Sequence, residues 1–204
     1  MGAKERRARH KSELRERILV AARELFAAEG IDNVSMRRIA ERIEYSPKTL
    51  YLYFKNKGEI LYYLCEEAFR KLDQLTAGME FSEENPEDLV RRGLRLYVDF
   101  GLAHPHDYRI AFLSDARHYP YRTHDELPPD SVSLAIHTRF GMILRKGAEQ
   151  GVFREMDPLL TTHVLWAGVH GLTTVLIFDP EFHWVDRDRF INETIEALLR
   201  SLKN

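Results

Sequence analysis

Apolar residues recur at helical spacing along most of this chain. Leu14, Ile18, Ala21 and Leu25 lie four, three and four residues apart, which places them on one face of a helix that ends at Gly30. No segment alternates apolar and polar residues at every second position for long enough to predict a strand. The pattern therefore predicts an all-α protein of about nine helices.

Polar residues and prolines mark where the helices begin. Ser35 is expected to cap a short helix that runs to about Ile43, and Ser46-Pro47 a third helix that runs to about Phe54. Asn85-Pro86 and Asp157-Pro158 have the same pattern. The later helices are expected over 56–78, 85–104, 107–113, about 20 residues ending at 150, 157–178 and 186–202, with a loop over 114–130.

Composition excludes several classes of protein. The chain has 204 residues and a single cysteine, Cys65, which excludes an internal disulfide, a Cys-based zinc finger and an iron–sulfur site. Cys65 is either a small buried residue or a redox sensor. The charged N-terminus does not resemble a secretory signal, and the most apolar stretch, 163–178, is shorter than the roughly 20 residues of a membrane span. We expect a cytoplasmic protein with no membrane partner.

The formal net charge of −2 conceals an uneven distribution. Residues 1–60 contain 14 Lys and Arg against 9 Asp and Glu, whereas residues 61–204 contain 16 against 23. A basic N-terminal part on an acidic remainder indicates that the first 60 residues meet a polyanion such as double-stranded DNA.

The two short helices at 35–43 and 46–54 have the spacing of a helix-turn-helix, whose second helix can enter the major groove. Hydroxyl groups and cations bind phosphate oxygens, and Arg or Lys can also recognise guanine. The candidate groups are Arg37, Arg38, Lys48, Thr49, Tyr51, Tyr53, Lys57 and the helix start at Ser46.

The stretch 30–61, GIDNVSMRRIAERIEYSPKTLYLYFKNKGEIL, resembles the DNA-binding region of TetR-family transcriptional regulators. This resemblance implies a helix-turn-helix domain over residues 1–56 and a helical effector-binding and dimerisation domain over residues 57–204. It also implies that Arg37 contacts a base or a phosphate, that Ser35, Thr49, Tyr51 and Lys57 bind phosphate, and that Lys48 and Tyr53 face base edges.

Two features of this part depart from or extend the family pattern. Glu44 stands where the family commonly has glycine, so we expect either an uncommon backbone angle or a different turn there. The arm before the first helix is basic, and it is either a DNA-contacting segment or a disordered tail. The arm contains Lys4, Arg6, Arg7, Arg9 and Lys11.

The remainder is expected to form the homodimer and the effector site. The resemblance implies that the last two helices pair with those of a second copy as a four-helix bundle, and Leu165–Leu172 resembles a Trp-x-x-x-His-Gly signature of some C-terminal domains. Gly168 and Gly171 allow close helix approach, either there or inside one subunit. The candidate effector-binding residues, each of which could instead be ordinary core, are Tyr97, Phe100, His104, Tyr108, Phe112, Phe140, Trp166 and His170.

These observations predict a homodimeric, ligand-responsive repressor that leaves a pseudo-palindromic operator when a small, largely apolar effector binds. We expect no cofactor and no catalytic residue. We also expect no metal site, since His163 and His170 lie about 10 Å apart on a helix, too far to bind one zinc ion. The alternatives are a DNA-binding regulator without an effector, and a helical enzyme using Asp115, His118, His124 or Asp125 in the 114–130 loop.

Overall fold

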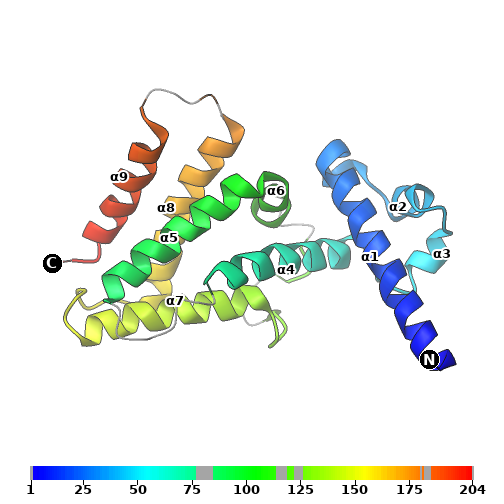
Figure 1. The fold of residues 1–204 in the computed structure, drawn as a ribbon, viewed down its shortest axis with the longest axis horizontal. Coiled ribbons are helices and arrows are strands. Elements are labelled where there is room, and N and C mark those ends of the chain that lie inside the picture. The colour runs from blue at the N-terminus through cyan, green and yellow to red at the C-terminus, as the bar shows by residue number, and fades with distance from the viewer. Residues whose placement is uncertain are drawn as a thin grey trace. The chain divides into compact units, whose positions relative to one another are not determined.

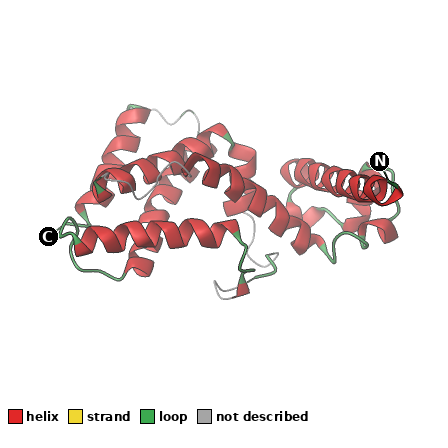
Figure 2. Ribbon diagram, turned by 60° about the horizontal axis from the view of Figure 1, so that its bottom comes forward, coloured by secondary structure: helices red, strands yellow, loops and turns green. Residues whose placement is uncertain are grey.

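The computed structural model describes residues 2–76, 85–113, 119–121, 126–179, 181 and 185–203. These residues form nine α-helices and no strand (Figures 1 and 2), which confirms the all-α prediction. The helices are α1 (Ala3–Glu29), α2 (Met36–Arg42), α3 (Pro47–Leu50), α4 (Lys57–Thr76), α5 (Pro86–Ala103), α6 (Pro105–Leu113), α7 (Val132–Glu149), α8 (Pro158–Phe178) and α9 (Arg187–Arg200), and a 3₁₀ turn, η1 (Ile31–Asn33), follows α1.

The helices begin where the capping residues predicted. Side-chain oxygens of Ser35, Ser46, Asn85 and Asp157 each accept a hydrogen bond from a backbone N–H in the first turn of the helix that follows. Such caps satisfy donors that have no partner inside the helix. The helix starts are therefore set by local sequence.

Two helix boundaries differ from the sequence-based expectation. The basic arm does not precede α1 but forms its first turns, because the helix already begins at Ala3. The helix α3 ends at Leu50 rather than near Phe54, since the backbone N–H groups of Leu52 and Tyr53 bond to carbonyls three residues back. Bonds of that kind tighten the end of a helix into a turn.

The chain divides into two compact units, and each has its own core. Unit 1 consists of 1–68 and 106–126, and unit 2 of 69–105 and 127–204. This division differs from the functional boundary expected between residues 56 and 57, because most of α4 belongs to the first unit. That functional boundary remains a prediction.

In unit 1 the helix-turn-helix packs onto α1. Ile18 and Leu19 of α1 are fully buried with Ile39 of α2 and Leu50 of α3, and Phe54 closes the same core. Burying apolar side chains of this size stabilises a fold by about 1.5–3 kcal/mol each. The polar sides of α2 and α3 are thereby left facing outward.

In unit 2 the helix α5 packs against α7, α8 and α9 (Figure 1). Gly168 allows α8 to lie close to α9, since a Cβ at this position would fall 2.7 Å from a methyl carbon of Leu198. Gly168 therefore serves packing inside one subunit, whereas Gly171 faces open space.

Among the described residues, α8 is the one helix long and apolar enough to cross a membrane by length and composition alone. Its Leu165, Val169, Leu172 and Leu176 are buried inside unit 2. A core helix of a globular domain has this property as well, and the burial favours that interpretation.

Candidate nucleic-acid interface

The turn between α2 and α3 has the uncommon backbone angle at Glu44, which was one of the two alternatives expected there. Glu44 has a φ of 62°, the one positive φ of a non-glycine residue in the described chain. The next residue, Tyr45, donates its backbone N–H to the Ala40 carbonyl at 3.0 Å, which closes the end of α2. A β-carbon makes this conformation unfavourable by about 1–2 kcal/mol. The core contacts of α2 and α3 outweigh that cost.

The outward face of α3 combines a cation with hydroxyl groups. Lys48 is exposed, and the Tyr51 side chain is 56% exposed although it follows a fully buried Leu50. The Ser46 hydroxyl lies 3.0 Å from the Thr49 hydroxyl and also caps the helix. These groups suit contact with phosphates and base edges.

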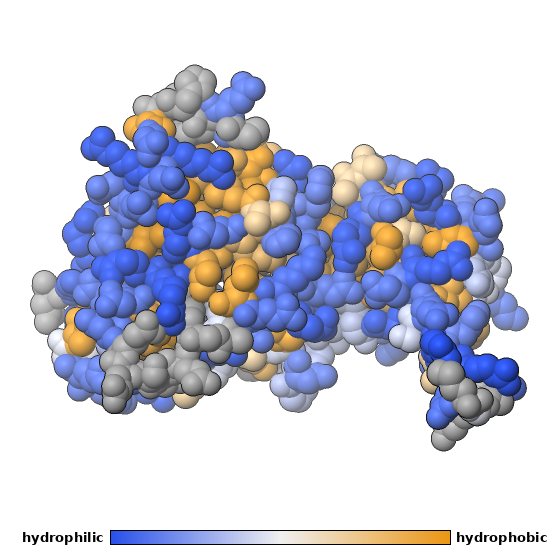
Figure 3. Space-filling model, in the orientation of Figure 1, coloured by the Kyte–Doolittle hydropathy of each residue, from blue (hydrophilic) through white to orange (hydrophobic). Residues whose placement is uncertain are grey.

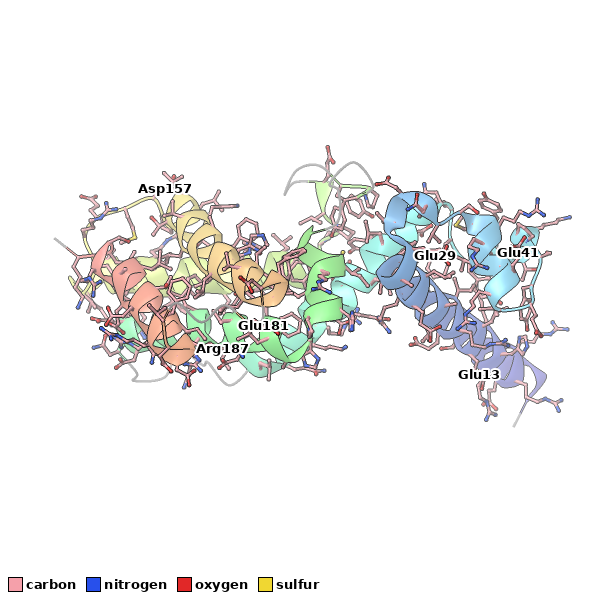
Figure 4. The ribbon with its side chains drawn as sticks, turned by 90° about the horizontal axis from the view of Figure 1, so that it is seen from above. Glu13, Glu29, Glu41, Asp157, Glu181 and Arg187 are labelled. Carbon is pink, nitrogen blue, oxygen red and sulfur yellow. The ribbon has the colours of Figure 1, made fainter. Side chains whose placement is uncertain are left out.

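The arginines of α2 are exposed but paired within the protein. Arg37 bonds to Glu41 at 2.9 Å, and Arg38 bonds to Glu29 at 2.9 Å (Figure 4 labels both glutamates). The hydrogen bond and charge of Glu29 raise the pKa of Arg38. Both arginines would have to exchange a carboxylate for a phosphate in order to bind DNA, so their net contribution is smaller than that of an unpaired cation.

Three other predicted DNA-binding residues have roles inside unit 1. The Ser35 hydroxyl accepts a hydrogen bond from the Arg38 backbone N–H. The Lys57 ammonium donates to the Ile31 carbonyl, which joins the start of α4 to η1, and Tyr53 is half-buried. Lys57 retains two further donors, so this bond is compatible with a phosphate contact.

Two arginines of α1 that the sequence analysis did not single out hold the motif in place. The Arg15 guanidinium lies 4.0 Å from the centre of the Tyr63 ring and 5.1 Å from that of Phe54. Arg17 donates to the Ile43 carbonyl at 3.3 Å, next to the positive-φ turn. No local pattern could have predicted these contacts, because the partners of each arginine lie far along the chain.

Three of the predicted effector-binding residues form a connected cluster in unit 2. The Trp166 indole N–H donates to the Tyr97 hydroxyl oxygen at 3.2 Å, and that hydroxyl lies 3.2 Å from His170 Nδ1. The Trp166 and His170 rings stack with centres 4.9 Å apart. Burial lowers the pKa of His170, so a neutral imidazole that accepts the Tyr97 proton at Nδ1 fits the cluster.

The other predicted effector-binding residues do not join this cluster. Phe100 is buried beside the exposed His104, with ring centres 5.4 Å apart, and Phe140 is half-buried. Tyr108 and Phe112 belong to unit 1, where their rings lie 4.9 Å apart. The eight residues therefore do not share one compact unit.

A hollow in unit 2 has a different character from the expected apolar site. Its volume is about 570 Å³, and it lies between α5 and α9. Arg91 donates to Glu196 at 2.6 Å and to Glu87 at 3.0 Å, so much of its charge is compensated. The hollow is lined by Asp88, Arg91, Arg92, Arg95, Leu96, Asn192, Ile195 and Glu196, and none of these is a predicted effector-binding residue.

Cys65 does not have the environment of a redox sensor. It is 1% exposed, and burial, together with the charge of Glu66, raises the pKa of its thiol to about 12. A buried, protonated thiol reacts slowly with oxidants.

Among the described residues, no three His, Cys, Asp or Glu side chains are grouped to hold a metal ion. The loop residues considered for an enzyme (Asp115, His118, His124 and Asp125) lie outside the described residues.

The helix α8 exposes an apolar stripe on the side opposite its buried face. Leu160 and Phe178 are each 63% exposed, and Val164 and Val175 lie on the surface between them. Ala167 and the open Gly171 continue the stripe at helical spacing. Figure 3 shows apolar residues gathered among hydrophilic ones on the surface of unit 2.

Comparisons with known proteins agree on one family. The model of the bacterial regulatory proteins of the tetR family matches residues 18–64, and that of the tetracyclin repressor-like C-terminal domain matches residues 90–202. The uncharacterized HTH-type transcriptional regulator YfiR of Bacillus subtilis is 26% identical over 182 residues, 84% of either chain. A second uncharacterized HTH-type transcriptional regulator, from Haemophilus influenzae, is 36% identical over 76 residues, 37% of this chain and 40% of its own.

Solved structures share the fold. A bacterial regulatory protein in the tetR family from Rhodococcus RHA1 has a TM-score of 0.66 at 20% identity, covering 93% of this chain and 96% of its own. The fatty acid degradation regulator FadR from Bacillus halodurans has a TM-score of 0.70 at 19% identity, with 91% of this chain and 94% of its own covered.

Proposed function

Since the chain belongs to the TetR family of bacterial regulatory proteins, which are DNA-binding transcriptional regulators, we propose that it is a homodimeric repressor controlled by a small, largely apolar effector. The observation that carries this proposal is the outward face of α3, where Lys48 and Tyr51 are exposed while Leu50 is buried. Its place of action would be the cytoplasm.

In this proposal α3 enters the major groove. Lys48 and Tyr53 meet base edges there, while Ser46, Thr49 and Tyr51 bind phosphates. Ser35, Arg38 and Lys57 contact the backbone beside the groove, and Arg37 contacts a base or a phosphate. One motif covers half a site, so two copies related by a twofold axis would recognise a pseudo-palindrome whose half-sites lie about 34 Å apart.

The dimer would form through the last two helices. The exposed stripe on α8 that contains Leu160, Val164 and Phe178 supports this assignment, because apolar residues at this spacing bury one another when two helices pack. On α9 the exposed residues include Arg187, Asp188 and Glu193, which suit the polar rim of such an interface.

The effector would bind in the C-terminal domain, and the Tyr97–Trp166–His170 cluster is the best-supported place for it. The cluster combines aromatic surface with polar groups that can change partners. An effector that binds more tightly to the DNA-free dimer than to the DNA-bound one would release the operator.

The experiment begins with selection of a duplex by the wild-type chain from a random pool. A Lys48→Ala/Tyr51→Ala variant should bind that duplex at least about 10-fold more weakly, with a smaller dependence of affinity on salt. Arg145→Ala, which removes an exposed charge from unit 2, is the control and should bind like wild type. If the double variant retains wild-type affinity and salt dependence, α3 is not the recognition helix.

The effector is tested by thermal shift with a panel of apolar and aromatic compounds. A compound that raises the melting temperature of wild type, but not of Tyr97→Phe or Trp166→Phe, places the site at the cluster. A shift that survives both substitutions places it elsewhere, and a panel without any shift favours the regulator that works without an effector.

A further inference from the structure

The first turns of α1 and the residues after α3 enclose an open groove of about 680 Å³ within unit 1. Arg6 and His10, and likewise Arg7 and Lys11, are four residues apart, so all four share one side of the helix. They face Leu52 and Tyr53 in the turn that follows α3. The predicted DNA-binding set contains only Tyr53 of these residues, because the sequence pattern separates the basic arm from the motif.

The cations of this groove differ from those of α2. Arg37 and Arg38 are paired with glutamates. In the part of the chain that the structure describes, the side chains of Arg6, Arg7 and Lys11 make no ion pair. Unpaired cations on one face attract a polyanion without first losing an internal partner, so their full charge is available to a phosphate.

The other side of the groove also suits a nucleic-acid backbone. The Leu52 side chain is 74% exposed, an unusual position for an aliphatic residue beside three cations. A sugar–phosphate chain has anionic oxygens for the cations and apolar deoxyribose faces for a leucine. The open shape admits a continuous strand, whereas a free anion would find no closed cage of donors.

We propose that this groove binds the backbone phosphates of DNA next to the base pairs that α3 contacts, so that each subunit's footprint on DNA extends beyond the helix-turn-helix. The inference rests on the proposed function, because it places α3 in the major groove. The first turns of α1 then act as a second, sequence-independent DNA-binding element of the same domain.

The same helix supplies a matched control. Arg9 lines a different hollow, together with Ser12, Glu13, Glu16 and Arg17. Figure 4 labels Glu13 in this first part of α1. Arg7→Gln, Lys11→Gln and Arg9→Gln each remove one positive charge from neighbouring turns, and glutamine keeps a high helix propensity.

The measurement is the affinity for the selected duplex as a function of salt concentration. For Arg7→Gln and for Lys11→Gln we expect the slope of log K against log salt to become shallower by about 0.9 for each phosphate that is no longer neutralised. Affinity should fall about 3- to 10-fold near physiological salt. Arg9→Gln should bind like wild type, and Arg7→Lys should recover most of the affinity because it restores the charge.

A second measurement determines where along the DNA the groove binds. Removing base pairs from the ends of the selected duplex should weaken wild type before it weakens Arg7→Gln/Lys11→Gln, because the double variant no longer binds the flanking phosphates. Equal sensitivity of both proteins to trimming would overturn the proposal. So would an Arg9→Gln effect as large as that of Arg7→Gln.

Other outcomes are equally distinct. If wild type binds no duplex at all, both the proposed function and this inference are wrong. If wild type binds through Lys48 and Tyr51 while Arg7→Gln and Lys11→Gln keep the wild-type salt slope, only the groove assignment is wrong. A melting temperature that inorganic phosphate raises in wild type but not in Arg7→Gln, with unchanged DNA binding, would identify a free-anion site and also overturn it.

Discussion

The outward faces of α3 and α8 differ although both helices bury their other side. Around α3 the exposed residues include a cation and hydroxyl-bearing side chains, as at Lys48 and Tyr51, beside the exposed Leu52. Along α8 they are Leu160, Val164 and Phe178. Folding requires only that each helix have one apolar side, so the other side is free to match a partner. The difference teaches that one unit is suited to a polyanion and the other to a second apolar surface.

The largest effect is expected where the apolar stripe of α8 is interrupted. Val164→Asp places a charge in the proposed interface, where burial without a partner is strongly unfavourable. We expect a monomer at micromolar concentration in sedimentation. Operator affinity should be at least about 100-fold weaker, because the two helix-turn-helix domains no longer bind DNA together. Leu159→Asp is the control, since Leu159 is exposed but turned about 100° from Leu160. A dimeric Val164→Asp would place the interface elsewhere.

A smaller effect, confined to the core of unit 2, is expected from Gly147→Ala. A Cβ at Gly147 would lie 2.2 Å from a ring carbon of Phe153, which is buried. The ring has to move, which destabilises the fold by about 1–3 kcal/mol. Chemical denaturation measures the decrease in stability, while operator affinity of the folded protein should not change. Gly141→Ala is the control for stability, since a Cβ there would lie 3.9 Å from the Thr162 hydroxyl oxygen, an ordinary contact.

A substitution at Glu44 is expected to increase the stability of unit 1 and not to decrease it. Glu44→Gly removes the strain of the positive φ and should stabilise the protein by about 1 kcal/mol. Glu44→Ala removes the same carboxylate but keeps the β-carbon, so it should not gain this stability. Both variants should bind DNA slightly more tightly, since a negative charge near the phosphates is removed. Equal stability of the two variants would contradict the strain argument.

The smallest effect concerns pH and His170. Because burial lowers the pKa of His170 in the folded state, the unfolded chain takes up a proton first as the pH falls. The contribution of this residue to stability is therefore complete above the ordinary histidine pKa of 6.5 and declines below it. His170→Gln should flatten this part of the stability curve between pH 8 and 5. An unchanged curve would show that His170 does not titrate in this way.

Much of the fold could be predicted because its signals are local. The caps at Ser35, Ser46, Asn85 and Asp157 lie within three residues of the groups that they bond. The family pattern, with its usual glycine at Glu44, narrowed that turn to an uncommon backbone angle or a different turn, and the structure has the former. The candidate site was harder to predict from local signals. The partners of Lys57 and Arg38 are distant in sequence, so the sequence could not show that these two cations are already bonded within the protein.

By itself, the sequence determined which segments are helical, where the capped helices begin, and that the first 60 residues carry a net positive charge. Only the tertiary structure decided which charges remain unpaired and which apolar residues stay exposed. It paired Arg38 with Glu29, joined Lys57 to the Ile31 carbonyl, and left Val164 outside the core of unit 2. The physical reason is that capping and helical periodicity act over a few residues, whereas ion pairing and burial depend on residues that only folding brings together.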